Sequence, residues 1–345
     1  MQKFCYIFLI LTLLIPTSKA NTLAQKFSPV IIKSTTNRDE PNTGDYFIAN
    51  DLEKAFQELN LKTDIDYRTE YHRPHNPKEK LSIYMRGYTK FYAPFDQGYN
   101  ILYVYYPMAF DKLSHQKINK NTLNKRPPMP KNANLDDDFQ NYDLIAVASL
   151  SYAKKLKNSG INAVYVPQFT NPDKFYPNFS EDLKTDILFV GSNWHDRTSL
   201  RYAIEAGFDV SVYGYNWTGY VPQELYKGTY IPNDILNKYY SSAKIVLNDH
   251  RPDMKAYGFI NNRIYDATAT GTLVISDYIK EIEDIYHGCV PTYKTKEELV
   301  SLLNYYLTHE EERLQKAQCA KEITLKNFTH TQIAKTLLES ANQNP

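Results

Sequence analysis

The chain has few cysteines, the residues whose disulfides cross-link small domains. It contains 3 cysteines in 345 residues. A disulfide-based scaffold is therefore excluded, and a cysteine-based zinc site is not supported. Cys289 and Cys319 lie in segments that are predicted to be separate elements, so one disulfide is possible but nothing in the sequence requires it.

The sequence also lacks an excess of charge of either sign. Lys and Arg number 40 against 39 Asp and Glu, which gives a formal net charge of +1. No strongly basic face is indicated, so nucleic acid is not an expected partner. His72, His75 and Glu70 do not have the spacing of a metal site. We predict no metal and no bound cofactor.

No apolar run is long enough for a comfortable transmembrane span. The first 20 residues combine Lys3, an uncharged apolar run over 4–15 and a small-residue end at 18–20. This is the layout of a secretory signal peptide, predicted over residues 1–20. We therefore expect an exported protein, periplasmic or extracellular. If the segment is not cleaved, it anchors the N-terminus in the membrane; an ordinary element of the fold is the third reading.

What the sequence does contain is two series of alternating strands and helices, the pattern of doubly wound α/β sheets. We predict an N-terminal Rossmann-like domain over 21–167, a linker over 168–183, a C-terminal Rossmann-like domain over 184–330 and a tail over 331–345. The expected strands are 28–34, 63–67, 81–85, 101–106, 142–148, 163–167, 185–190, 210–214, 244–248 and 273–275. The expected helices are 45–61, 149–159, 197–206, 236–241, 261–270, 294–308 and 310–328. Residues 117–138 are expected to form a loop or an irregular insertion.

The stretch from Tyr257 to Asp277, YGFINNRIYDATATGTLVISD, predicts a turn, a short helix and a buried strand. The helix begins with polar residues, among them Asn262 and Arg263. A helix N-terminus beside an Arg favours a diphosphate, and Asp266, one turn further on, is placed to hold a ribose. The alternative is that Arg263 and Asp266 form only a local surface ion pair.

A second phosphate-binding candidate follows the strand at 185–190. Gly191 and Ser192 precede a helix, and Arg197 lies at its start. Such a turn presents backbone N–H groups and a guanidinium near a phosphate, although it is neither a Walker loop nor a G-x-G-x-x-G sequence. A plain turn with a solvated Arg197 is the alternative. His195 is a candidate acid–base group, or a structural histidine.

Two further positions follow from the expected edge of each sheet. Asn248 and His250 come at or just after the strand at 244–248, where loops line the ligand cleft of α/β sheets. We predict that Asn248 contacts the donor, the alternative being an ordinary polar loop. Gly44, between Thr43 and Asp45, allows a phosphate or an acceptor to approach the backbone closely. The alternative there is a helix N-cap by Thr43.

Three segments, DILFVGSNWHDR at 186–197, KIVLND at 244–249 and NNRIYDATATGTLVISD at 261–277, resemble the CgeB/YkvP-like spore-maturation glycosyltransferases. The segment VPQFTNPDKFYP at 166–177 is similar to the one that joins the two domains in that group. The resemblance covers about residues 140–340. It implies the GT-B fold and retaining transfer from a nucleotide-sugar donor to an unknown acceptor, without a metal.

The resemblance also implies roles for single residues. Arg197 and Arg263 stabilise the departing diphosphate, and Gly191, Ser192, Asn248, Asn262 and Asp266 are placed at the donor. Gly44 lies outside the resemblance and is a candidate donor contact from its position at a helix start alone. Related enzymes often carry two Glu eight positions apart; here Asp266 takes the second place and Gly258 the first. That glycine and the signal peptide favour an alternative function, an exported two-lobed ligand-binding protein without activity.

Overall fold

The structure is a computed structural model. It describes residues 26–41, 43–70, 81–87, 98–107, 139 and 142–344. The predicted signal peptide at 1–20 and the predicted insertion at 117–138 lie outside the described residues.

The first half of the chain forms a parallel sheet of six strands in the order β2-β1-β3-β4-β5-β6. The strands are β1 (Val30–Lys33), β2 (Thr63–Asp66), β3 (Leu81–Arg86), β4 (Tyr99–Val104), β5 (Leu144–Val147) and β6 (Ala163–Tyr165). The helices are α2 (Gly44–Glu58), α6 (Leu150–Asn158) and the 3-10 turn η1 (Arg68–Glu70).

The second half repeats this arrangement, with a parallel sheet in the order β12-β11-β10-β7-β8-β9. Its strands are β7 (Thr185–Val190), β8 (Val210–Tyr213), β9 (Tyr226–Gly228), β10 (Ala243–Asn248), β11 (Leu273–Asp277) and β12 (Thr292–Tyr293). Its helices are α7 (Thr198–Glu205), α8 (Leu236–Ser242), α9 (Pro252–Tyr257), α10 (Asn262–Ala269), α11 (Lys280–Tyr286), α12 (Lys296–Thr308) and α13 (Glu310–Asn327). The prediction of two Rossmann-like units is confirmed.

The apolar runs of the sequence explain why these strands are central. The strand β5 reads LIAV, and all four of its residues are buried. Strands of a parallel sheet that is covered on both faces need such continuous apolar runs. Helix starts follow equally local rules: the hydroxyl of Thr43 accepts from Tyr46 N at the start of α2, and that of Ser149 accepts from Tyr152 N at the start of α6.

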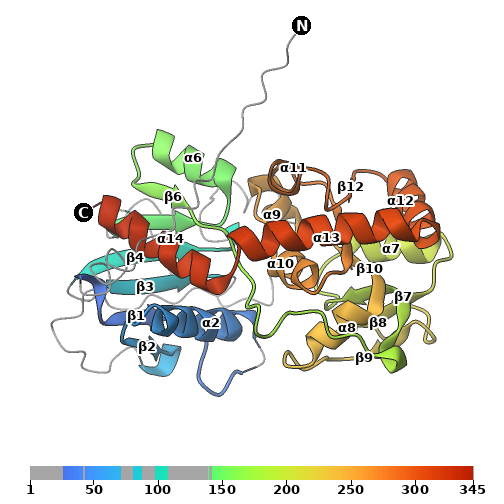
Figure 1. The fold of residues 1–345 in the computed structure, drawn as a ribbon, viewed down its shortest axis with the longest axis horizontal. Coiled ribbons are helices and arrows are strands. Elements are labelled where there is room, and N and C mark those ends of the chain that lie inside the picture. Colours follow the sequence, from blue (N-terminus) through green and yellow to red (C-terminus); the bar gives the residue numbers. More distant parts are fainter. Residues whose placement is uncertain are drawn as a thin grey trace, which may run out of the picture.

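The chain crosses between the two domains twice, and the crossings lie side by side. The linker, which contains the 3-10 turn η3 (Glu181–Leu183), carries the chain to the second domain. The return passes from α13 to α14 (His330–Gln343), and Figure 1 shows α13 over the second domain and α14 over the first. The two crossings pair at Thr170 and Thr329, where Thr170 N donates to Phe328 O at 2.9 Å and His330 N donates to Thr170 O at 2.9 Å. This pairing joins the two crossings into one connection between the domains.

Several features were not predicted. The short elements β9, α9, α11 and β12 have too few residues to show a clear period. Cys289 and Cys319, whose pairing the sequence left open, form a disulfide between the loop after α11 and helix α13. Within the described part of the chain, no helix has the length and apolar character that crossing a membrane requires.

Candidate active site between the two domains

Two loops at the carboxyl ends of β7 and β8 pack backbone against backbone. A methyl group added at Gly214, where φ is +145°, would lie 2.2 Å from the carbonyl oxygen of Gly191. The indole of Trp217 donates to that same oxygen at 2.7 Å. Tyr215 N donates to the hydroxyl of Ser192 at 3.1 Å. These contacts fix the loop that carries Gly191 and Ser192 in an open turn.

Two guanidinium groups meet above Gly191. A methyl group at this position would lie 2.8 Å from Nη2 of Arg263 and 3.4 Å from Nη2 of Arg197. Both groups also lie over the ring of Phe189, with Arg197 at 5.8 Å and Arg263 at 5.5 Å from its centroid. A side chain at position 191 would therefore displace the guanidinium of Arg263 from its present place. Arg197 at the start of α7 and Arg263 in α10 thus converge although they are 263 − 197 = 66 positions apart in the sequence.

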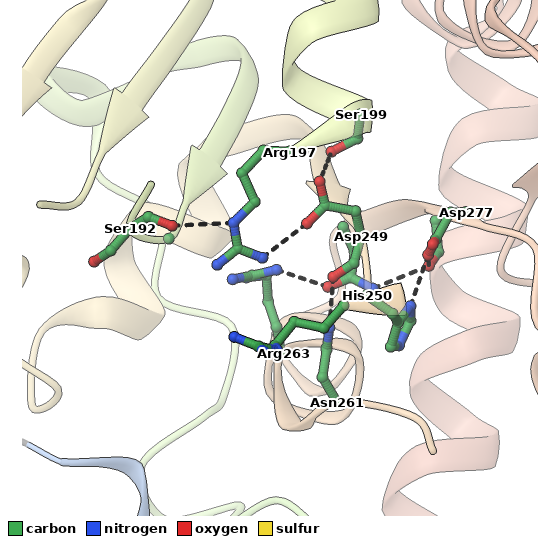
Figure 2. Close-up of polar contacts among 12 residues, drawn as sticks. Ser192, Arg197, Ser199, Asp249, His250, Asn261, Arg263 and Asp277 are labelled. Atoms are coloured by element: carbon green, nitrogen blue, oxygen red, sulfur yellow. Dashed lines mark hydrogen bonds and ion pairs between the residues drawn. The ribbon is translucent and has the colours of Figure 1, made fainter. Parts of the chain in front are cut away.

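Each arginine is hydrogen-bonded to a side chain at the carboxyl end of β10, either on its last residue or on the residue that follows. Arg263 donates from Nη1 to Oδ1 of Asn248 at 2.8 Å. Arg197 donates from Nη1 to Oδ1 of Asp249 at 3.0 Å and from Nε to the carbonyl of Ser192 at 3.0 Å (Figure 2). The sequence alternative of a local Arg263–Asp266 ion pair is thus wrong, because the arginine points to Asn248 instead.

The positive charge at this point is not fully balanced. Burial lowers the pKa of Arg197, Asp249 opposes that shift, and the neighbouring Arg263 lowers the pKa further. Arg263 contacts the neutral amide of Asn248 instead of a carboxylate. Two guanidinium groups beside a single contacting carboxylate form a site that favours an anion with several oxygen atoms, such as a diphosphate.

His195 lies in the same loop and is uncharged at neutral pH. Burial lowers its pKa to about 3, with further contributions from Arg197, Arg251 and Arg263. Both ring nitrogens are buried and have no hydrogen-bond partner within the described residues. In this state the imidazole can hydrogen-bond to a ligand but carries no proton to donate as an imidazolium acid. Its predicted acid–base role remains untested.

His250 is held by a carboxylate from the next strand. Its Nδ1 lies 2.6 Å from Oδ1 of Asp277, and the two side chains are almost fully buried (Figure 2). Burial raises the pKa of Asp277, but His250 and Lys255 more than offset that effect, and the net shift is downward. Residues 248, 249 and 250 thus each make a separate polar contact: with Arg263, Arg197 and Asp277.

The other predicted donor contacts line a cavity of about 220 Å³. Its lining comes from both domains and the linker and consists of Gly44, Phe47, Ile48, Asp51, Phe169, Phe175, Val190, Asn233, Tyr240, Asn262, Arg263 and Asp266. Arg263 belongs to both the cavity and the arginine pair, so it joins the two parts of the site. At Gly44 a methyl group would meet nothing within 4 Å. The structure therefore brings all nine predicted residues into one continuous region.

Both carboxylate oxygens of Asp266 are already hydrogen-bonded, one to the linker and one to its own helix. Its Oδ1 accepts from Thr170 at 2.8 Å, and its Oδ2 accepts from Asn262 at 2.7 Å. Burial raises the pKa of Asp266 well above its ordinary value. A ribose contact by Asp266 would have to replace one of these hydrogen bonds.

Sequence reasoning missed some residues of the site. Asp249 was noted in its loop but not as the partner of Arg197, and Asp51 was not singled out at all. Asp51 offered a signal, because it falls on the apolar stripe of α2 between Ile48 and Ala55. A polar residue on the buried face of a helix requires a partner. Over the described ranges, no cluster of three or more His, Cys, Asp or Glu side chains could hold a metal ion.

The second half of the chain is similar to known glycosyltransferase-like proteins. Residues 186–339 match the family model described as glycosyl transferase-like. Most of the C-terminal domain is therefore similar to that family. Its CgeB-like character, expected from the sequence, is confirmed by spore protein CgeB of Bacillus subtilis (strain 168), which is 27% identical over 194 residues. That match covers 50% of this chain and 59% of CgeB, so it spans about three fifths of the relative's length.

Solved structures show the same two-domain fold over nearly the whole chain. Sucrose-phosphate synthase from Thermosynechococcus elongatus superposes with a TM-score of 0.66 at 14% identity and covers 92% of this chain and 98% of its own. The catalytic domain of starch synthase IV from Arabidopsis thaliana gives 0.61 at 10% identity, with 91% and 99% covered. A mutant of the phage T4 glucosyltransferase BGT, in complex with UDP-glucose, gives 0.55 at 14% identity, with 91% and 99% covered. The fold is GT-B, as predicted.

Proposed function

We propose that the protein is a glycosyltransferase that moves a sugar from a nucleoside-diphosphate sugar to an acceptor hydroxyl. The similarity of residues 186–339 to the glycosyl transferase-like family and the GT-B fold support this reaction class. The observation that carries the proposal for this chain is the meeting of Arg197 and Arg263 above Gly191. Retention of configuration and independence of metal are part of the proposal.

The two arginines stabilise the leaving group. When the bond between the sugar and the diphosphate breaks, negative charge gathers on the diphosphate oxygens. Guanidinium groups that are already held in place by Asn248 and Asp249 meet that charge without having to reorganise. The positive charge that a metal ion would bring is then supplied by side chains.

The remaining predicted contacts divide between the domains. Gly191, Ser192, Asn248 and Asn262 belong to the second domain and hold the donor, together with Asp266 at the ribose. His195, which is neutral, adds a hydrogen bond near the phosphates. Gly44 lies at the start of α2 and lets the donor or the acceptor approach from the first domain.

Binding of nucleotides tests the proposal directly. UDP, GDP, TDP and CMP, with and without their sugars, are added to residues 21–345, and the melting temperature is followed together with tryptophan fluorescence. Trp194 and Trp217 are the two tryptophans, and both flank the loop of Gly191. A ligand that binds only the folded protein raises the melting temperature. We expect one diphosphate to do so and its sugar conjugate to release free diphosphate when an acceptor is present.

Two arginine variants test whether a diphosphate binds at the proposed site or whether any nearby arginine affects its binding. Arg263→Ala removes a charged contact, which is worth about 1.5–3 kcal/mol, and should weaken diphosphate binding tenfold or more. Arg201→Ala is the matched control, because Arg201 lies on α7 beside Arg197 but pairs with the exposed Asp196. Equal binding by both variants, or no response of the native protein to any nucleotide, contradicts the proposal.

Export of the chain also remains a proposal. The Cys289–Cys319 disulfide supports it, since disulfides persist mainly in oxidising compartments. Fractionation of cells that make the full-length chain, followed by mass determination of the mature protein, tests whether residues 1–20 are removed.

A further inference from the structure

A carboxylate from the first domain faces the cavity between the domains. Asp51 lies on the buried side of α2 and lines the cavity. Its two hydrogen bonds both end on Oδ1, which accepts from Asn171 at 2.7 Å and from Lys174 at 2.6 Å. Its Oδ2 has no partner within the described residues. One oxygen of Asp51 is therefore anchored and the other is available to a ligand.

The second carboxyl group of the cavity differs in this respect. Both oxygens of Asp266 accept hydrogen bonds, from Thr170 and Asn262. Burial and, to a smaller extent, the nearby Asp51 raise the pKa of Asp266. Lys174 forms an ion pair with Asp51 and none with Asp266. Of the two acids, Asp51 is the one that has an oxygen open to whatever enters the cavity.

The charges around the cavity indicate which part of a donor lies beside Asp51. Arg263 lines the same cavity and belongs to the arginine pair that favours phosphate. A carboxylate repels phosphate oxygens and accepts hydrogen bonds from hydroxyl groups. With about 220 Å³, the cavity is smaller than the roughly 300–1,000 Å³ of sites for drug-sized ligands. It is too small for a whole nucleotide sugar, so its lining faces the parts of the donor on either side of the diphosphate, the ribose at Asp266 and the transferred sugar at Asp51.

We infer that Asp51 contacts a hydroxyl group of the transferred sugar and that its negative charge stabilises the sugar during transfer. This rests on the proposed function. The bond from the sugar to the diphosphate breaks, and its electron pair stays with the diphosphate oxygen beside Arg263. The acceptor oxygen forms the new bond to the same carbon and gives its proton to the departing diphosphate. Asp51 takes no proton. Its negative charge stabilises the positive charge that develops on the sugar ring.

A purely structural role for Asp51 makes a different prediction. Two ion pairs of opposite polarity join α2 to the linker: Asp51 with Lys174, and Lys54 with Asp173. If Asp51 only fastens the helix, its loss should act through folding alone, as the loss of the more exposed Asp173 would to a smaller extent. Asp173 does not line the cavity, and its side chain is 65% exposed. Asp173→Asn is therefore the matched control for Asp51→Asn.

The experiment compares a nucleoside diphosphate with its sugar conjugate. UDP and UDP-glucose, GDP and GDP-mannose, and TDP and TDP-glucose are titrated against the wild type, and the pair that binds is used for the variants. We expect Asp51→Ala to weaken the sugar conjugate tenfold or more while the free diphosphate changes less than threefold. Asp51→Asn keeps an acceptor oxygen but no charge, so its kcat should fall at least a hundredfold with a smaller change in KM. Asp173→Asn should match the wild type in all of these.

The outcomes separate the inference from the proposed function. A wild type that binds no nucleotide overturns the proposed function itself. A wild type that binds a diphosphate and its sugar conjugate, with the ratio of the two affinities unchanged in Asp51→Ala, overturns only the role of Asp51. Equal losses in Asp51→Asn and Asp173→Asn also overturn it, because they show a structural link. Melting temperatures of all variants identify any that do not fold, and Asp51→Asn, which preserves shape, serves where Asp51→Ala fails.

Discussion

The carboxylate of Glu281 fills the space that any side chain at position 258 would need. A methyl group on Gly258 would lie 2.1 Å from Oε1 of Glu281. The backbone at Gly258 also has φ of +71° and ends helix α9 in the left-handed region. Glycine is therefore fixed here by two separate causes, a backbone conformation and a neighbouring acid from α11. Its presence in place of an acid is a property of this local packing.

Substitution of Gly258 should destabilise the protein. Gly258→Ala forces a residue with a Cβ into the left-handed region, which costs about 1–2 kcal/mol, and displaces the carboxylate of Glu281 as well. Gly160→Ala is the control, because Gly160 has φ of +82° and no atom within 4 Å of the added methyl group. We expect thermal unfolding to show the larger loss for Gly258→Ala. Equal losses of stability in the two variants would show that the carboxylate of Glu281 moves aside without destabilising the protein.

Asp266 should make the stability of the folded protein depend on pH between pH 4 and pH 7. Its pKa in the folded protein is raised, so it keeps a proton that the unfolded chain releases above about pH 3.9. Stability falls as the pH rises from that value towards the raised pKa. Asp266→Asn removes this titration. The melting temperature of the wild type minus that of the variant should therefore decrease from pH 4 to pH 7; a constant difference would contradict the burial of a protonated carboxyl group.

His195 should act in the opposite direction on acidification. Its pKa of about 3 in the folded protein lies below its ordinary value of 6.5. The unfolded chain binds a proton between these values that the folded chain does not, so stability falls as the pH drops below about 6.5. His195→Gln does not titrate. Thermal melts from pH 7 to pH 4 should show the wild type losing more stability than His195→Gln, and parallel curves would show that folding does not lower the pKa of His195.

The sequence was most informative where local patterns decide the structure. The strand predicted over 185–190 has the same bounds as β7, and the helix predicted over 149–159 is α6, which Ser149 caps. The convergence of Gly191, Arg197 and Arg263 was also accessible, because carboxyl ends of neighbouring parallel strands lie at one edge of a sheet.

Partners that lie far apart in the sequence were not accessible in this way. The spacing of Arg263 and Asp266 suggested a local ion pair, but Arg263 instead reaches Asn248 on the neighbouring strand, and Asp266 reaches Thr170 in the linker. Which of several possible partners a polar side chain takes depends on how the domains and strands pack. The same reason kept Asp51 out of the predicted site, since its role depends on a cavity that forms only when both domains and the linker come together.

The Cys289–Cys319 disulfide should contribute measurably to the stability of the second domain. It closes a loop with a sequence separation of 30 residues. A cross-link of this size reduces the entropy of the unfolded chain and stabilises by about 3–4 kcal/mol, or on the order of 10 °C in melting temperature. Calorimetry with and without reductant should show this loss in the wild type. The variant with Ser at both positions should melt at the lower temperature under both conditions, which separates the disulfide from other effects of the reductant. Two free thiols in the non-reduced, folded protein would contradict the prediction and would also remove the structural support for export.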